Sequence, residues 1–169
     1  MPTANDSTTL PQGDPALLRT EAAAELLTSR VPARLAYVAR DGTPRIVPTW
    51  FHWTGDELVM ATFVWAPHIH RPAARLRDLA ANPAVAITID TERFPPVVLS
   101  VRGEVSITEV AGLAPEYAAA AHRYLGDDAA TAYLAQIDQP GTTMARIGLR
   151  PRWVGLIDFD TRVPAVMAS

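Results

Sequence analysis

Three β-prone segments joined by very short turns constrain the fold of this chain more than any other feature. The segments are Arg34–Arg40, Arg45–Trp53 and Glu57–Val64, and the turns are Asp41–Pro44 and Thr54–Asp56. Asp-Gly and Gly-containing tripeptides between apolar runs are typical hairpin signals. A parallel crossover needs a dozen or more residues, so turns this short allow only antiparallel pairing. The sequence therefore predicts an antiparallel meander.

The rest of the chain adds strands and a few short helices. After the meander, a helix is expected at Pro72–Ala81, with Pro72 at its N-terminus and a stop at Asn82-Pro83. An earlier helix is expected at Thr20–Ser29, with Thr20 as its N-cap. Two further strands are predicted at Ala84–Ile89 and Val97–Thr108, the second with a bulge near Gly103. Two helices are predicted at Ala114–Leu125, which ends at Gly126, and at Asp128–Gln136, which has Asp127-Asp128 as an N-cap pair. The last two strands are predicted at Thr143–Leu149 and Trp153–Phe159, on either side of a turn at Arg150–Arg152. This pattern predicts a mainly β fold of six to seven antiparallel strands, which commonly close into a barrel, with a few flanking helices.

The length favours one domain. A chain of 169 residues can bury one hydrophobic core, and its 49% apolar and 20% charged residues are ordinary for a globular protein. Residues 1–17 are rich in Pro, Ser, Thr, Asp and Gly and lack apolar periodicity. We expect a disordered tail over 1–17 and a single domain over 18–169.

Charge and hydropathy exclude several classes of partner. The formal net charge of −3 argues against a nucleic-acid partner, which needs a basic footprint. No apolar run approaches the roughly 20 residues that span a bilayer. No basic segment followed by an apolar core marks a secretory signal, so a cytoplasmic location is expected.

The chain contains neither cysteine nor lysine, and all 15 basic side chains are arginines. Disulfides, thiolate nucleophiles and cysteine-based metal sites are therefore excluded. Without lysine, Schiff-base chemistry with pyridoxal phosphate is excluded as well. A phosphate site would have to use arginine, histidine, hydroxyl groups or backbone N–H groups.

The candidate phosphate site lies in the basic helix. Arg71 and Arg75 are four residues apart and are expected on one helix face, while Arg77 points elsewhere. Two guanidinium groups near a helix N-terminus can bind a phosphate through charge and fork geometry. The alternative is that Arg75 pairs with Asp78 and that Arg71 is solvated.

The second segment offers a surface for a planar ring. Pro48 cannot donate to a ladder, so its position is expected at a sheet edge or a bulge. Trp50, Phe51 and Trp53 could stack on a ring, although core or dimer-interface packing is the commoner fate of such side chains. Strand alternation places Trp50 and His52 opposite Phe51 and Trp53, so only one of these pairs can face a ligand.

The histidines suggest a metal only weakly. His68 and His70 could share one side of an extended chain with His52 as a third ligand, but no clustered carboxylate completes a set, so no metal is expected. No catalytic acid or base is identified. His68 and Tyr37 are candidates by side-chain type alone.

These residues resemble the flavin-binding split-barrel family of pyridoxamine 5′-phosphate oxidase and its deazaflavin-dependent relatives. The resemblance rests on the order and spacing of several short motifs and covers most of the chain after Ala33. The motifs are Asp41-Gly42-x-Pro44, Arg45-x-Val47-Pro48-x-Trp50-Phe51, Ala61-Thr62, Arg75-x-x-x-Leu79-x-x-Asn82-Pro83-x-Val85, and Met144-Ala145-Arg146-Ile147 followed by Pro151-Arg152-Trp153.

The resemblance implies a split barrel that forms a homodimer, with cofactor sites at the subunit interface. In such proteins the second strand lies along the cofactor ring, a pair at the end of the third strand lies near the ribityl or phosphate end, and a basic helix residue binds phosphate. The cofactor-binding residues implied by the resemblance or by the basic helix are Arg45, Val47, Pro48, Thr49, Trp50, Ala61, Thr62, Arg71 and Arg75. The loop Phe63–Ala74 is longer than in the oxidase, and the oxidase's C-terminal substrate signature is not evident, so pyridoxine phosphate is not the expected substrate.

The leading hypothesis is an oxidoreductase that uses FMN or a deazaflavin (coenzyme F420), with the deazaflavin favoured. It would transfer hydride to or from a small planar or unsaturated molecule. One alternative is a non-enzymatic binder of flavin, haem or a tetrapyrrole on the same fold, because no acid–base group stands out. Another is a split-barrel dimer whose site is degenerate and empty.

Overall fold

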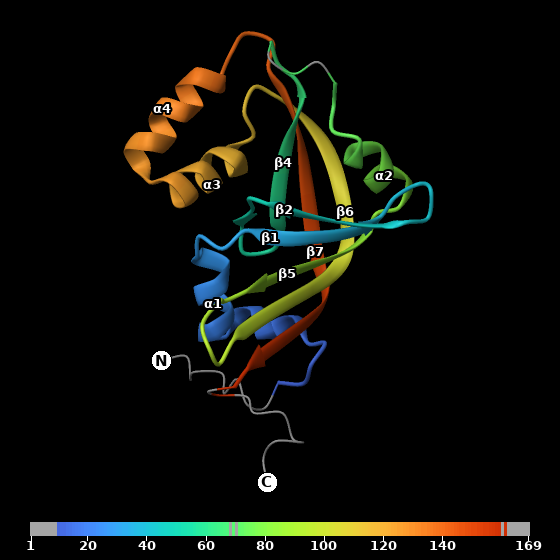
Figure 1. The fold of residues 1–169 in the computed structure, drawn as a ribbon, viewed down its shortest axis with the longest axis vertical. Coiled ribbons are helices and arrows are strands. Elements are labelled where there is room, and N and C mark those ends of the chain that lie inside the picture. Colours follow the sequence, from blue (N-terminus) through green and yellow to red (C-terminus); the bar gives the residue numbers. More distant parts are fainter. Residues whose placement is uncertain (1–9, 68, 70, 160, 162–169) are drawn as a thin grey trace.

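The computed structural model describes residues 10–67, 69, 71–159 and 161, in which seven strands form one antiparallel sheet (Figure 1). The strands follow the spatial order β2-β1-β5-β6-β7-β4-β3. Their bounds are β1 Ala33–Val38, β2 Pro44–Thr49, β3 His52–Trp53, β4 Leu58–Trp65, β5 Ala84–Asp90, β6 Val97–Ala111 and β7 Thr143–Asp158. The predicted mainly β, seven-stranded antiparallel fold is confirmed, and the sheet is not closed.

The second predicted strand is divided between the two edges of the sheet. Residues Pro44–Thr49 pair with β1, whereas His52–Trp53 pair with β4 at the opposite edge. The chain crosses from one edge to the other through Trp50 and Phe51. The prediction of one continuous strand to Trp53 is therefore wrong, because each half finds a different partner. The two edges of the sheet therefore separate at this crossing. Pro48 lies on the edge strand β2, as expected.

The two longest strands, β6 and β7, pair along their whole lengths with one register shift at Arg102/Gly103. The predicted bulge near Gly103 is confirmed, but the predicted turn at Arg150–Arg152 is wrong because β7 runs without interruption. Pro151 lies opposite Gly103 at the shift, where a residue without an N–H group is tolerated. A Cβ on Gly103 would lie 2.3 Å from the carbonyl oxygen of Arg150, so only glycine allows this approach.

The N-terminal segment contacts the rest of the domain from an earlier residue than expected. The 3-10 helix η1 spans Pro15–Arg19, and Leu17 within it is fully buried. Gln12 exchanges two hydrogen bonds with the backbone of Leu156 in β7, and the N–H of Gly13 donates to the Val154 carbonyl at 2.7 Å. The expectation of a disordered tail is therefore wrong for residues 10–17, while residues 1–9 lie outside the described part.

Helix α1 spans Glu21–Thr28 and begins at Thr20, whose side chain accepts from the N–H of Ala23 as predicted. Helix α2 spans only Arg75–Ala81. The prediction that it starts at Pro72 is wrong, so Arg71 is not on this helix and does not share a face with Arg75. The first backbone hydrogen bonds at this end run from the N–H groups of Leu76 and Arg77 to the carbonyls of Ala73 and Ala74, so Pro72 lies outside the helix.

Helices α3 (Pro115–Leu125) and α4 (Asp127–Ile137) form a hairpin beside β4 (Figure 1). Gly126 separates them with a φ of 84°, a conformation that glycine adopts without strain. Gly126 is also the N-cap of α4, so the predicted Asp127-Asp128 cap is wrong and both aspartates lie in the first turn. There they face the positive end of the helix dipole.

Arg123 of α3 holds the crossing between the two sheet edges in place. Its guanidinium donates to the carbonyl oxygens of Phe51 and Leu27. It also lies 4.4 Å from the centre of the fully buried Phe51 ring. One arginine therefore joins α3, the end of α1 and the crossing.

A second arginine attaches α3 to the sheet. Arg146 of β7 donates from Nε to Glu116 and from Nη2 to Glu57, each at 2.8 Å. Burial alone would raise the pKa of Glu116, but the hydrogen bond and charge of Arg146 outweigh it and hold that pKa below its ordinary value.

Replacing Arg123 by methionine is expected to lower the free energy of unfolding by about 2–4 kcal/mol, because two carbonyl groups lose a charged donor. Chemical denaturation measures the effect. The matched control is Arg77→Met on the exposed face of α2, which is expected to change stability by less than about 0.5 kcal/mol. Equal stabilities of the two variants would show that Arg123 does not hold the crossing.

The Glu116–Arg146 pair predicts a pH-dependent contribution to stability. Because the folded pKa of Glu116 lies below the unfolded value of about 4.3, the contribution is present above that pH and is lost as pH falls through the folded pKa. Glu116→Gln should therefore be less stable than wild type at pH 7, and the difference should shrink as the pH is lowered below about 4.5. Thermal melts from pH 7 to pH 3 measure it. Glu104→Gln, which removes an exposed partner of Arg152, is the control and should show little difference at any pH.

Candidate functional site

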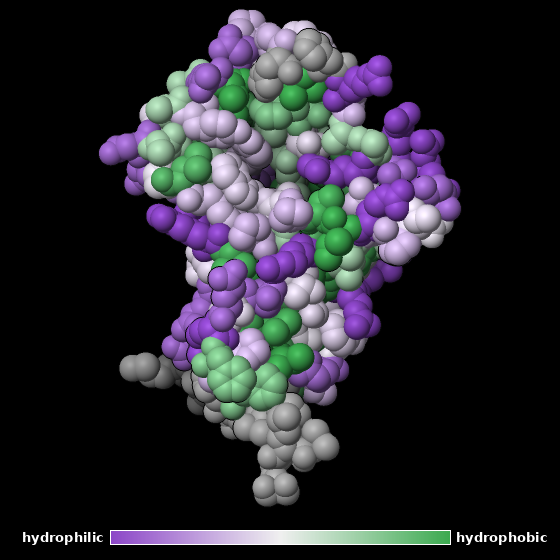
Figure 2. All heavy atoms as spheres, in the orientation of Figure 1, coloured by the Kyte–Doolittle hydropathy of each residue, from purple (hydrophilic) through white to green (hydrophobic). Residues whose placement is uncertain are grey.

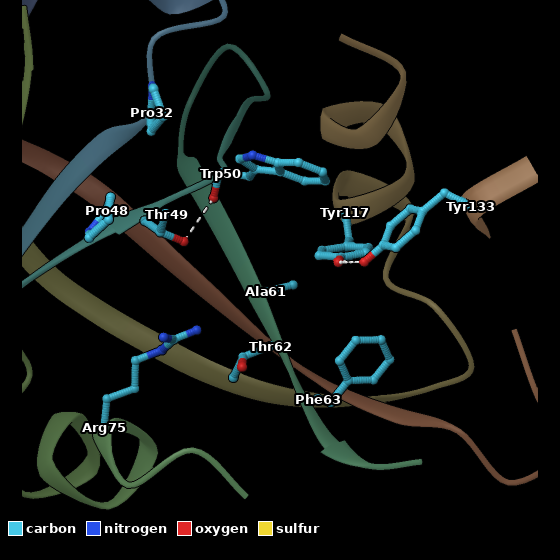
Figure 3. Close-up of a pocket in the computed structure, with 10 residues that line it drawn as sticks. All are labelled: Pro32, Pro48, Thr49, Trp50, Ala61, Thr62, Phe63, Arg75, Tyr117 and Tyr133. Atoms are coloured by element: carbon cyan, nitrogen blue, oxygen red, sulfur yellow. Dashed lines mark hydrogen bonds between the residues drawn. The ribbon is translucent and has the colours of Figure 1, made fainter. Parts of the chain in front are cut away.

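A pocket of about 460 Å³ opens between the β2 edge and the α3–α4 hairpin (Figure 3). Its walls come from β2, β4, α2, α3 and α4, together with the segment before β1. The lining residues are Pro32, Pro48, Thr49, Trp50, Ala61, Thr62, Phe63, Arg75, Tyr117 and Tyr133. The pocket therefore lies beside the crossing at Trp50, where the two sheet edges separate.

One side of the pocket is cationic. Figure 3 shows the Arg75 guanidinium extending from α2 toward Thr49 and Thr62. Within the described residues no carboxylate pairs with it, because Asp78 is engaged by Arg40 through its guanidinium at 3.4 Å and its backbone N–H at 3.2 Å. The alternative pairing of Arg75 with Asp78 is thus not formed.

Burial lowers the pKa of Arg75, and the nearby Tyr37 opposes this shift. A partly desolvated cation without an anionic partner is costly. An anion bound in the pocket would remove this cost, so the position favours a phosphate or carboxylate group of a ligand.

The opposite side is aromatic. Trp50 stacks on Tyr124 with ring centres 5.1 Å apart and planes 7° from parallel, which fixes the indole against α3. Phe63 meets Tyr117 edge-on at 6.0 Å. A planar ring that enters the pocket would contact this wall, because aromatic side chains pack well against other aromatic rings.

Two hydroxyl groups complete the aromatic wall. The Tyr117 and Tyr133 oxygens are 2.6 Å apart, across the two helices of the hairpin. Burial, and then the hydrogen bond to Tyr133, raise the pKa of Tyr117 well above its usual value. The Tyr117 hydroxyl therefore stays protonated at neutral pH.

Most of the residues expected at the site lie together. Pro48, Thr49 and Trp50 from the second predicted strand line the pocket, as do Ala61, Thr62 and Arg75. Three expected residues do not line it. Arg45 bonds to Asp41 and Thr43 at the hairpin turn, Val47 packs against the core, and Arg71 is exposed before α2.

Four lining residues were missed by the sequence analysis, namely Pro32, Phe63, Tyr117 and Tyr133. The two tyrosines are sixteen residues apart. Their meeting follows from the helix break at Gly126, which sequence reasoning did find. That the hairpin then docks beside β4 is a tertiary contact that carries no local signal.

The other candidates lie elsewhere. Phe51 and Tyr37 belong to the core, so Phe51 is excluded from the ring surface, and Trp53 also packs against the core. His52 is half-buried outside the pocket, and burial followed by the charge of Arg123 lowers its pKa. His68 and His70 lie outside the described residues. Among those described, no three His, Cys, Asp or Glu side chains gather as a metal site.

The pocket fits a ring cofactor that carries an anionic tail. Arg75 and Thr62 could hold the tail, while the β2 backbone around Pro48 and the Trp50 indole could hold the ring. The described lining includes no carboxylate and no imidazole. Such a pocket can bind, orient and exclude water, but redox chemistry in it would have to come from the bound group.

Comparisons with known proteins agree with this geometry. No curated protein matches the chain significantly. It is similar to an F420 reductase (TM-score 0.57, 26% identity, 78% of this chain and 94% of the other). It shares its fold with a conserved hypothetical protein from Mycobacterium tuberculosis (TM-score 0.62, 16% identity, 88% of this chain and 90% of the other). It also shares its fold with a heme binding protein from Mycobacterium smegmatis (TM-score 0.52, 21% identity, 81% of this chain and 52% of the other).

The expected family is also shown by a direct match to its sequence model. The model described as pyridoxamine 5′-phosphate oxidase matches residues 19–156, which include every lining residue of the pocket. An open antiparallel sheet with a ligand-sized pocket at its split is the arrangement that the resemblance implied. With sequence model, fold and pocket in agreement, this chain belongs to the pyridoxamine 5′-phosphate oxidase family.

Proposed function

We propose that this protein is an oxidoreductase that uses a flavin-type cofactor and transfers hydride to or from a small planar or unsaturated molecule. The observation that carries the proposal is Arg75, a partly buried cation that faces the pocket without a carboxylate partner in the described structure. It stands opposite an aromatic wall. These are the two features that a ring cofactor with an anionic tail requires.

A deazaflavin is the favoured cofactor, and FMN is the alternative. The similarity to an F420 reductase supports the deazaflavin, because that match covers 94% of the other chain at 26% identity. The two cofactors share a planar tricyclic ring but differ in their tails. Arg75 can bind a phosphate in either tail.

The residues of this chain would act by binding and orientation. A bound flavin-type ring supplies the hydride chemistry. Arg75 and Thr62 fix the tail, and β2 and Trp50 fix the ring against the open sheet edge. The aromatic wall excludes water from the ring surface, which strengthens the electrostatic interactions inside the pocket.

Ligand binding without catalysis is the second candidate. It is favoured by the lack of a carboxylate or imidazole among the described lining residues. A binder would hold flavin, haem or a tetrapyrrole and give no turnover. Steady-state reduction of any acceptor at catalytic protein concentrations, with either cofactor present, would remove this candidate.

The first experiment is a side-by-side titration of the purified protein with FMN and with F420, followed by absorbance and fluorescence. Micromolar binding of either cofactor is expected, with F420 tighter. A protein that binds neither at micromolar concentration would overturn the proposed function.

Arg75→Ala is expected to weaken cofactor binding about ten- to hundredfold, because it removes a charge-assisted contact of roughly 1.5–3 kcal/mol. The melting temperature without cofactor should change little. Arg77→Ala, on the same helix but exposed, is the matched control and should bind as wild type does. Unchanged affinity in Arg75→Ala would place the anionic tail elsewhere.

We also propose that the protein acts as a homodimer, as the resemblance implies. On β1 and β2, Ala36 and Val38 share the outward face with Ile46, and Ile46 is 66% exposed. Figure 2 shows apolar side chains over this hairpin, bordered by polar ones. A second copy packed on this face would bury them.

Ile46→Asp is therefore expected to shift the protein from dimer to monomer, because a carboxylate would be buried in the interface. Sedimentation velocity measures the mass. Phe94→Asp, which changes a side chain 95% exposed on the loop between β5 and β6, is the control and should remain dimeric. A wild-type protein that sediments as a monomer would contradict the proposal.

A further inference from the structure

The Tyr117–Tyr133 hydroxyl pair is a feature of the pocket that cofactor binding does not require. The two side chains reach the cavity from different helices of the α3–α4 hairpin, and Figure 3 shows their hydroxyl groups meeting on the side away from Arg75. Both tyrosines are half-buried. A polar pair in an otherwise aromatic wall selects ligands by hydrogen bonding.

Counting donors shows that the pair has a proton to offer. Two hydroxyl groups carry two O–H donors, and the 2.6 Å contact uses one of them. The hydroxyl that accepts keeps its own proton. No other hydrogen bond joins either oxygen to the described residues, so this proton is available to a ligand in the pocket.

The protonation state fixes the kind of ligand atom. Burial and the neighbouring hydroxyl raise the pKa of Tyr117, so the Tyr117 hydroxyl acts as a neutral donor and not as an anion. A neutral O–H donor pairs with a carbonyl or comparable acceptor oxygen. Because it is uncharged, it does not supply the charge that a phosphate needs.

We propose that the Tyr117–Tyr133 pair binds an acceptor oxygen of the substrate, and that the substrate is a planar conjugated carbonyl compound that lies between the cofactor ring and the α3–α4 hairpin. This inference rests on the proposed function, which assigns the Arg75 side of the pocket to the cofactor. The tyrosines are then substrate-binding residues that select for a carbonyl group. The neighbouring ring of Phe63 accepts the flat body of the molecule.

The test compares two probes of the same shape, 1-indanone and its parent hydrocarbon indane. Their affinities are measured by nuclear magnetic resonance titration, with and without bound cofactor. Wild type should bind the ketone about two- to tenfold more tightly than the hydrocarbon, which is the effect of one hydrogen bond. The double variant Tyr117→Phe/Tyr133→Phe should bind both probes alike.

The single variants sharpen the test. In Tyr117→Phe or Tyr133→Phe the remaining hydroxyl no longer bonds to its neighbour, so its proton is released to the ligand and at least one of them should keep the preference for the ketone. Tyr124→Phe is the matched control. It removes a hydroxyl of α3 that donates to the Val31 carbonyl outside the pocket, and the preference should be unchanged.

The outcomes separate this inference from the proposed function. A double variant that still prefers the ketone, or a Tyr124→Phe variant that loses the preference equally, would overturn the role of the pair. If the double variant instead loses affinity for FMN or F420, the hydroxyl groups bind the cofactor and the inference is wrong. A protein that binds neither cofactor but distinguishes the probes through these tyrosines would remove the proposed function and keep the hydroxyl pair as a ligand site.

Discussion

The structure depends on the crossing at Trp50–Phe51, where one segment leaves the β2 edge of the sheet and joins the β3 edge. A sheet that ends in two edges has to cover or separate them. Here Phe51 enters the core at the crossing, and Arg123 donates to its carbonyl oxygen and lies over its ring. Because the edges do not pair with each other, the sheet stays open at this point. The pocket occupies that opening.

The two walls of the pocket are held by different parts of the fold. Helix α2, which carries Arg75, follows β4 and precedes β5, so its place depends on the meander. The α3–α4 hairpin follows β6 and is attached by Arg123 to the crossing and by Arg146 to β7. The cationic side and the aromatic side can therefore be altered separately.

Local sequence chemistry was enough to predict the sheet but not its edges. Asp41-Gly42 and the Gly126 break predicted the right turns because glycine alone adopts those backbone angles without cost. The continuous apolar pattern of Arg45–Trp53 hid the crossing, because alternation does not say which neighbour a strand pairs with. Pro151 was taken as part of a turn, whereas pairing with β6 continues β7 through it, with a bulge at this point. Leu17 was assigned to the tail because the segment around it has no periodicity, although it packs fully into the core.

The sequence by itself determined the antiparallel sheet, the edge position of Pro48 and the family, because each follows from residues close together in the chain. It also identified six of the lining residues, which lie on β2, at the crossing, on β4 and on α2. Only the tertiary structure decided that Arg75 faces the pocket without Asp78, since Asp78 pairs with Arg40 in the turn after β1. Only the tertiary structure brought Tyr117 and Tyr133 together beside Trp50. Contacts between segments far apart in the chain arise from packing, and packing leaves no period in the sequence from which they could be inferred.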